Sequence, residues 1–196
     1  MSTLRRAGFT LFEVMIALAL IGLVVTKVAL VMEEARRAHE QESVSMALED
    51  QALELIDKIA YALYGADAET LDPIMAPPFP TSKVNFHVSL GVEDGQPVWG
   101  DPEVIGLTED GRQLFWGENV GEGDERMVVW ANSVSAMLQD ELMNGIDDNG
   151  NELADELGLT FVMDQRSVTI RLTLERLHDD GKKVQATKET TVTCRN

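Results

Sequence analysis

Cysteine, histidine and basic residues are all scarce in this 196-residue chain. A single cysteine, Cys194, excludes an internal disulfide, and three scattered histidines lack the spacing of a zinc module. Lys and Arg number 16 against 34 Asp and Glu, which gives a formal net charge of −18. Nucleic-acid binding requires clustered basic residues, so this balance argues against a nucleic-acid partner. No phosphate-binding glycine loop or Ser-His-Asp order is present either, and we expect no enzymatic activity.

Long apolar runs are absent except for one near the N-terminus. Hydrophobic residues make up 44% of the chain, which is enough to build a core and too much for a disordered acidic tail. Between Phe9 and Met32 the charged residues are Glu13 and Lys27. A helix of this length, at about 1.5 Å per residue, covers the roughly 30 Å hydrocarbon core of a membrane. Residues 9–32 are therefore predicted to form a transmembrane helix.

The charges beside this run predict its orientation. Arg5 and Arg6 precede the run, whereas Glu33 and Glu34 follow it directly. The positive-inside rule then leaves the N-terminus in the cytoplasm and places the acidic remainder outside, in a single-pass arrangement. A secretory signal peptide is the competing interpretation, but this run is longer than a signal core and no small-x-small cleavage site ends it.

The start of the apolar run resembles a known family. The cleavage and methylation signature of type IV prepilins and type II secretion pseudopilins is similar to the segment Arg5-Arg6-Ala7-Gly8-Phe9-Thr10-Leu11-Phe12-Glu13-Val14. The resemblance implies that a membrane peptidase cuts after Gly8, removes a leader of residues 1–8 and methylates the new amino terminus at Phe9. It also implies that Glu13 pairs with the terminal amine of a neighbouring subunit during assembly.

This implied pairing has a physical reason. A carboxylate in hydrocarbon requires a cation, and the amine released at Phe9 lies about 6 Å from Glu13 along a helix axis. In subunits staggered along a fibre, the two groups can meet and neutralise each other. Lys27 lies further along the span, and we expect its side chain to reach the outer interface.

Helical character continues beyond the membrane segment. No Pro or Gly occurs between Met32 and Gly65, and one apolar stripe repeats at spacings of three and four residues. The stripe consists of Leu48, Ala52, Leu55, Ile59 and Leu63. We therefore predict one helix from Phe9 to about Tyr64, with residues 33–64 outside the membrane and their apolar stripe in the core. Pseudopilins are similar in having a long N-terminal helix whose second half is covered by a sheet.

Residues 65–196 are predicted to form a globular antiparallel β domain. Residues 65–83 contain several prolines and indicate an irregular connection. Alternating apolar residues predict strands over 84–90, 159–163, 168–174 and 184–194, and a short apolar run suggests another over 127–130. Residues 132–143 fit either a short helix or a strand. The expected fold class is α+β and pilin-like, with the long helix packed on one antiparallel sheet and Cys194 buried.

An acidic loop over residues 140–158 predicts a calcium site. Alternating oxygen-bearing side chains resemble positions 1, 3 and 5 of a calcium loop, and their oxygens suit a hard cation. The candidate ligands are Asp147, Asn149, Asn151, the backbone carbonyl of Leu153, Asp155 and Glu156. Glu152 replaces the usual glycine and Gly158 the usual final glutamate, so Glu156 or Glu141 would have to supply the missing carboxylate. A solvated acidic turn without a metal is the alternative.

The resemblance implies a function in a fibre. The chain is most similar to a minor pseudopilin of a type II secretion system, of the J type by its length and interrupted sheet. Its implied partners are other pseudopilins, the prepilin peptidase and the inner-membrane assembly platform, with the globular domain periplasmic or extracellular. A minor pilin of a type IV pilus is the alternative. A membrane-anchored calcium-binding module or enzyme is an alternative of another class.

Overall fold

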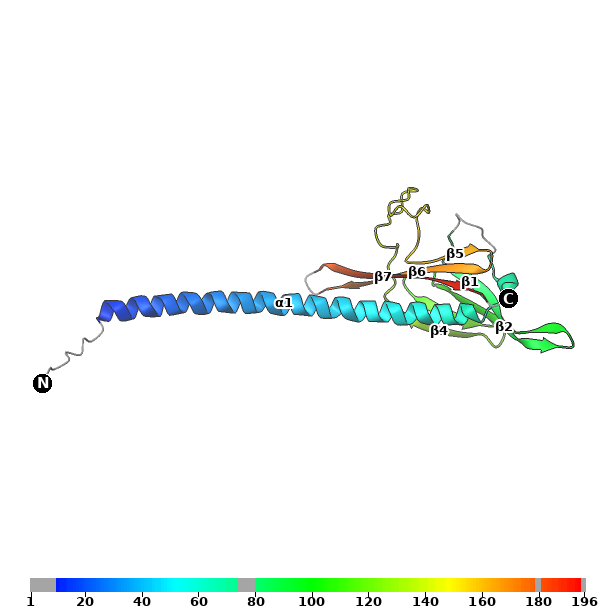
Figure 1. The fold of residues 1–196 in the computed structure, drawn as a ribbon, viewed down its shortest axis with the longest axis horizontal. Coiled ribbons are helices and arrows are strands. Elements are labelled where there is room, and N and C mark those ends of the chain that lie inside the picture. The colour runs from blue at the N-terminus through cyan, green and yellow to red at the C-terminus, as the bar shows by residue number, and fades with distance from the viewer. Residues whose placement is uncertain (1–9, 74–79, 179–180, 195–196) are drawn as a thin grey trace. The chain divides into compact units, whose positions relative to one another are not determined.

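The chain begins with one long helix and continues into β-structure (Figure 1). This computed structural model describes residues 10–73, 80–178 and 181–194. Helix α1 spans Leu11–Tyr64 without interruption, and a short 3-10 helix, η1, covers Ala68–Thr70. The predicted long helix is thereby confirmed over its described length. The chain divides within α1 into two compact units, residues 1–43 and residues 44–196, which are described separately below.

Seven strands in the described part of the second unit form two antiparallel sheets. The first sheet has the order β1-β2-β3-β4 and the second the order β5-β6-β7. The strands are β1 (Lys83–Glu93), β2 (Gln96–Leu107), β3 (Leu114–Glu118), β4 (Arg126–Ala131), β5 (Leu159–Asp164), β6 (Ser167–Leu177) and β7 (Lys183–Thr193). The predicted α+β, pilin-like architecture is therefore confirmed, with two sheets in place of the single expected one.

A backbone bridge between Thr81 and Phe161 links the two sheets. The N–H of Thr81 donates to the carbonyl of Phe161 at 3.0 Å, and the N–H of Phe161 donates to the carbonyl of Thr81 at 2.7 Å. This exchange joins the residues before β1 to the middle of β5. One hydrophobic core can therefore extend across both sheets.

Strands β2 and β3 were not predicted, because β2 contains turn-forming residues and β3 is short. Strand β2 contains Pro97, Gly100 and Pro102, which usually interrupt a strand. Its pairing with β3 begins only at Glu103, so both prolines lie where β3 is not a neighbour and no ladder hydrogen bond to β3 is required of them. Strand β3 is only five residues long and offers little alternation to detect.

The core of the second unit contains the predicted helix stripe. All five stripe residues are buried, and Ile56 joins them as a sixth. They belong to one cluster with apolar residues of both sheets, including Phe86 of β1 and Phe161 of β5, and Cys194 is buried in the same cluster. At the edge of the helix, the Lys58 ammonium lies 4.2 Å from the ring centre of Trp130 on β4.

Residues 132–143 form neither the helix nor the strand considered above. They run as an irregular segment with two isolated bridges, from Val134 to Leu174 and from Met137 to Leu157. Strand β5 covers only the first half of β6, up to Leu172, and residues 133–135 bond to the remainder. Residues 133–135 thus provide hydrogen-bond partners for the part of β6 that β5 does not cover, but the paired segment is too short to form a strand.

Candidate functional site

The N-terminal site is described from Thr10 onward. Gly8 and Phe9, the predicted cleavage and methylation residues, lie outside the described residues. Thr10 immediately precedes α1, and its carbonyl accepts the first helical hydrogen bond, from the N–H of Val14 at 3.2 Å. Thr10 therefore occupies the N-cap position of the helix.

Glu13 and Thr10 cap the helix together. The Thr10 N–H donates to Glu13 Oε2 at 2.8 Å, and the Thr10 hydroxyl donates to the same oxygen at 2.9 Å. In return, the Glu13 N–H donates to Thr10 Oγ1 at 3.3 Å. This reciprocal pattern is a capping box, which satisfies backbone donors that the helix itself leaves unpaired. Its sequence signal is the spacing Thr-x-x-Glu ahead of an apolar run, and the cap was not among the predicted features.

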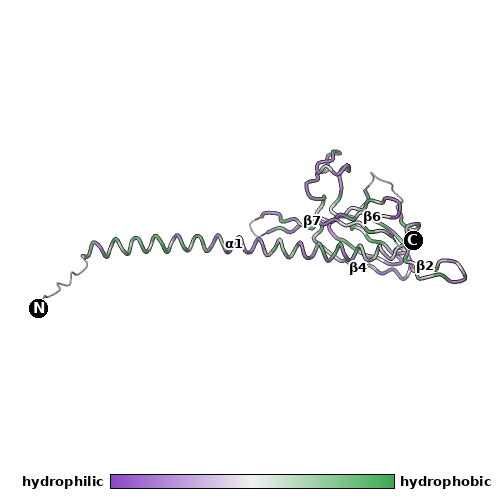
Figure 2. The backbone as a smooth tube through the Cα atoms, in the orientation of Figure 1, coloured by the Kyte–Doolittle hydropathy of each residue, from purple (hydrophilic) through white to green (hydrophobic). Residues whose placement is uncertain are grey.

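The first half of α1 is an exposed apolar surface. It contains an 18-residue stretch with a mean hydropathy of 2.6, and none of that stretch is buried. Figure 2 shows the apolar residues continuing along this part of the helix. Exposed fractions reach 80% at Leu11 and 71% at Phe12. A core helix of a soluble domain would have one face covered, so the surface requires another apolar environment.

Charged residues mark the end of this apolar stretch. Arg36 pairs with Glu33 at 3.1 Å and with Glu40 at 2.7 Å, and Arg37 pairs with Glu33 at 3.0 Å. All four side chains are exposed, and such pairs one helical turn apart are typical of a helix face in water. Within the apolar stretch, the Thr26 hydroxyl donates back to the carbonyl of Gly22 at 2.9 Å and so carries no unpaired donor.

The second candidate site is the acidic loop, which leaves the β-structure through a closed neck. The N–H of Leu138 donates to the carbonyl of Glu156 at 3.0 Å, and Met137 pairs with Leu157 beside it. Both sides of this neck also bond to β6. The Ser135 N–H donates to the Thr173 carbonyl at 2.9 Å, and the Thr173 N–H donates to the Gly158 carbonyl at 2.7 Å.

The middle of the loop is a tight turn over residues 147–152, organised by Asp147. Its Oδ1 accepts from the N–H groups of Gly150 at 2.6 Å and Asn151 at 3.2 Å. Its Oδ2 accepts from the N–H of Glu152 at 2.7 Å. Desolvation opposes the charge of Asp147, but these backbone hydrogen bonds outweigh it and lower the pKa of the carboxyl group. Glu152 has a φ of 70°, so it adopts the left-handed conformation that glycine usually provides there.

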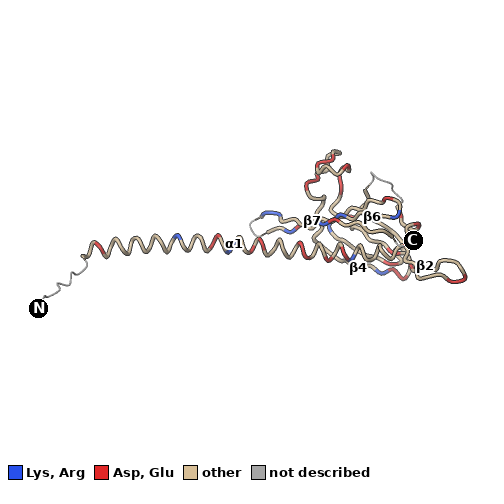
Figure 3. The backbone as a smooth tube through the Cα atoms, viewed as in Figure 1, with Lys and Arg blue, Asp and Glu red and all other residues tan. Residues whose placement is uncertain are grey.

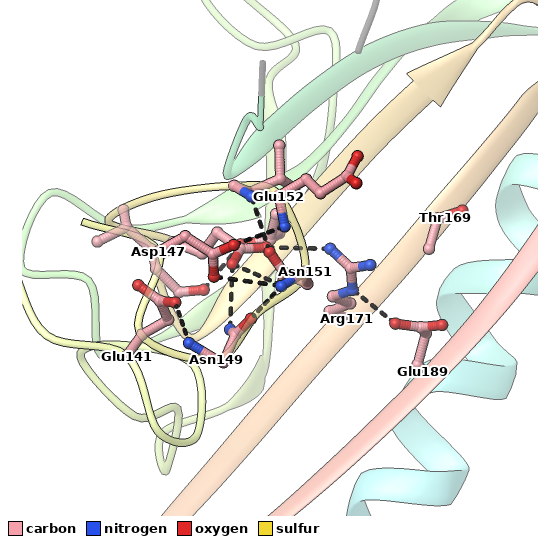
Figure 4. Close-up of polar contacts among 12 residues, drawn as sticks. Glu141, Asp147, Asn149, Asn151, Glu152, Thr169, Arg171 and Glu189 are labelled. Atoms are coloured by element: carbon pink, nitrogen blue, oxygen red, sulfur yellow. Dashed lines mark hydrogen bonds and ion pairs between the residues drawn. The ribbon is translucent and has the colours of Figure 1, made fainter. Parts of the chain in front are cut away.

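Glu156 is a buried carboxylate beneath this turn. The residue is 1% exposed, and its Oε2 accepts from the side-chain amides of Asn151 at 2.7 Å and Asn149 at 3.3 Å. Its Oε1 lies 3.1 Å from Arg171 Nη1, and Arg171 is shared with Glu189 at 2.5 Å (Figure 4). Burial opposes the charge of Arg171, but its two carboxylate partners prevail and raise the pKa of the guanidinium.

Glu141 enters the same turn from the start of the loop. It is 4% exposed, and its Oε1 accepts from the N–H groups of Asp148 and Asn149, each at 3.1 Å. Its other oxygen, Oε2, is buried and has no hydrogen-bond partner among the described residues. Among the predicted ligands, by contrast, the Asp155 carboxylate binds another part of the loop, where it accepts from the N–H groups of Asn144 at 2.7 Å and Gly145 at 2.9 Å.

The structure thus brings together most of the predicted loop residues. Asp147, Asn149, Asn151 and Glu156 are linked through the turn, and the Leu153 N–H donates to Asn151 Oδ1 at 2.9 Å. Within the described ranges, no three His, Cys, Asp or Glu side chains converge closely enough to form a metal site by themselves. The buried Glu141 was considered from the sequence only as a substitute, although the structure places it inside the turn.

Comparison with known proteins gives one result, at the N-terminus. Residues 3–26 match the family described as the prokaryotic N-terminal methylation motif. With the long apolar helix, this motif fits a type IV prepilin-like protein. It implies cleavage by a prepilin peptidase, membrane anchoring and assembly with other pilin-like subunits, a family of structural proteins. Comparison with curated proteins and with solved structures gave no match.

Proposed function

We propose that this chain is a minor pseudopilin, a structural subunit of a type II secretion pseudopilus that is cut after Gly8 and assembles through α1. The observation that carries the proposal is the methylation motif at residues 3–26, directly followed by an exposed apolar helix with Glu13 in its first turn. The J type is the form we favour, because of the chain length and the division of the β-structure into two sheets.

The apolar surface of α1 supports assembly within a membrane and then within a fibre. Full burial of each large apolar side chain there contributes about 1.5–3 kcal/mol of stabilising free energy. Lipid provides that burial before assembly, and the helices of neighbouring subunits provide it afterwards. The charge asymmetry around residues 5–37 supports a cytoplasmic N-terminus and a periplasmic or extracellular globular domain.

Glu13 supports a specific step in that assembly. The capping box uses one oxygen, Oε2, and holds the carboxylate at the start of the helix. The Thr10 N–H remains an amide after cleavage at Gly8, so the cap can persist in the mature chain. Oε1 is then available to a neighbouring subunit, and the methylated amine of Phe9 in that subunit is the cation that would neutralise the charge.

Substitution of Glu13 separates its capping role from its charge. Glu13→Gln retains the capping-box geometry, since glutamine also serves at this position, but it removes the charge. We expect Glu13→Gln and Glu13→Ala to be processed normally and to lose most of their incorporation into fibres, measured by shearing or crosslinking of cells that carry each variant. Thr10→Ala, which weakens the cap but retains the carboxylate, should lose far less. Normal incorporation of Glu13→Gln would contradict the proposed charge pairing.

A minor pilin of a type IV pilus is the second candidate, because the same motif and helix serve both systems. Deletion of the gene in its native host distinguishes them. Loss of exoprotein secretion with intact surface pili supports the pseudopilin, whereas loss of pili with normal secretion supports the pilin. An inventory of neighbouring genes for a secretin-linked platform would be the fastest preliminary observation.

A further inference from the structure

Three carboxylates contact the turn over residues 147–152, namely those of Glu141, Asp147 and Glu156. Glu141 contacts its start, through the N–H groups of Asp148 and Asn149. Asp147 contacts its end, through the N–H groups of residues 150–152. Glu156 lies beneath and holds the side-chain amides of Asn149 and Asn151. Figure 4 shows Glu141, Asp147 and Asn149 grouped on one side of Asn151, with Arg171 and Glu189 on the other.

Glu141 is the observation that calls for a ligand. A carboxylate at 4% exposure is costly to bury, and such groups are normally fully hydrogen-bonded. Here Oε1 has two backbone donors, and these fix the carboxylate inside the turn, whereas the buried Oε2 has no hydrogen-bond partner in the described part of the chain. A cation at Oε2 would supply the missing interaction.

The charge balance around the turn also favours a bound cation. Residues 140–156 contain seven Asp and Glu and no Lys or Arg. Figure 3 shows this loop as a concentration of acidic residues. Arg171 approaches from β6, but it pairs with Glu156 and shares its charge with Glu189. The charges of Glu141 and Asp147 are therefore not neutralised by that arginine.

We propose that this turn binds a calcium ion. Its carboxylate ligands are Glu141, through Oε2, and Asp147, and neutral oxygens come from Asn149, Asn151 and the Leu153 carbonyl. Glu156 is a positioning residue, because it accepts from both asparagine Nδ2 groups and so leaves their Oδ1 atoms within the turn. Asp155 anchors the loop entrance.

Calcium is the cation that this chemistry favours. It accepts six to eight oxygen ligands in flexible geometry, including amide and backbone carbonyls, so two carboxylates are sufficient. Histidine and cysteine, whose nitrogen and thiolate groups transition metals prefer, are absent from residues 140–156. Magnesium requires near-ideal octahedral geometry, which an irregular turn of this kind does not offer. With few charged ligands, the expected dissociation constant is about 10⁻⁴–10⁻³ M, the range of extracellular modules.

The test uses the full chain in detergent, treated with EGTA and held at constant ionic strength. Calorimetry with CaCl2 should show one site, and calcium at about 100 times its dissociation constant should raise the melting temperature by about 5–10 °C. Magnesium at the same concentration should produce a much smaller shift. No calcium-dependent shift, or an equal shift with magnesium, would overturn the proposal.

Two charge-neutralising variants in the same loop locate the site. Glu141→Gln should weaken calcium binding at least about tenfold, because it removes the unpartnered carboxylate oxygen. Glu152→Gln is the matched control, since Glu152 is exposed and its carboxylate points away from Glu141 and Asp147 in Figure 4, and it should bind within about twofold of the natural chain. Equal binding by Glu141→Gln and the natural chain would overturn the assignment.

The sign of the stability change gives a second readout. In EGTA, Glu141→Gln should melt at or above the temperature of the natural chain, because an uncompensated buried charge has been removed. In calcium, the order should reverse. If Glu141→Gln lacks a cooperative melting transition, Asp147→Asn takes its place and must show the same loss of calcium affinity. If the variant and the natural chain rank in the same order of melting temperature with and without calcium, the proposal is contradicted.

Discussion

At the scale of single residues, Glu13 combines a proposed role in assembly with an observed structural one. The family resemblance implies that it pairs between subunits, and the structure adds a local role, because it caps α1 with Thr10. The Thr-x-x-Glu spacing contained that information, so the cap was predictable from the sequence. The unpartnered oxygen of Glu141 was not, because it depends on the loop folding back so that residues 148 and 149 reach a residue seven and eight positions earlier.

Glu175 on β6 gives a pH-dependent prediction. Its side chain is 12% exposed and lies 3.1 Å from Lys183 and 3.6 Å from Arg112. Burial would raise the pKa of this carboxyl group, but the hydrogen bonds and charge of its partners, mainly Lys183, lower it. A lowered carboxyl pKa stabilises the folded state above the unfolded pKa, about 4.3, and that contribution is lost as pH falls through the folded pKa.

We therefore expect Glu175→Gln to destabilise the chain by about 1 kcal/mol at pH 7 and by progressively less below pH of about 4. Melting temperatures of the two proteins between neutral and acidic pH measure this convergence. Glu122→Gln, at an exposed position, should show little difference at any pH. A Glu175→Gln deficit that stays constant into acid would show that charge does not cause it.

At the scale of elements, helices and strands differed in how well the sequence predicted them. The apolar stripe from Leu48 to Leu63 follows a local period of 3.6 residues, and the structure buries every member. Strand β2 depends instead on where its neighbours end, because its prolines are tolerated only where β3 does not pair. The arrangement of the two sheets likewise rests on non-local contacts, such as the bridge from Thr81 to Phe161.

The neck of the acidic loop yields a prediction at Gly158. A Cβ atom at this position would lie 1.9 Å from the backbone oxygen of Ser135, so the neck closes only around a glycine. Gly158→Ala must push two bonded segments apart, and we expect a loss of about 2–3 kcal/mol in the free energy of unfolding. Gly123→Ala is the control, since a Cβ atom there would meet nothing within 4 Å and the change should alter stability by no more than about 0.5 kcal/mol. Equal melting temperatures would mean that the neck is not closed as described.

At the scale of the whole molecule, charge and hydropathy are separated along the chain. Removal of the proposed leader, residues 1–8, would take away Arg5 and Arg6 and change the formal net charge from −18 to −20. The exposed apolar surface lies in the first half of α1, whereas most acidic residues belong to the unit formed by residues 44–196. This separation is consistent with an anchor joined to an exported acidic domain, and it was predictable because it depends on composition rather than on tertiary contacts.

The N-terminus of the mature protein is the most direct test of prepilin-like processing. The full chain is expressed in membranes with and without a prepilin peptidase, and its first residues are determined by sequencing and mass spectrometry. With the peptidase, we expect a chain that begins with N-methylphenylalanine at Phe9; without it, the chain should begin at Met1. An intact Met1 in the presence of an active peptidase, or a cut near residue 32, would contradict such processing.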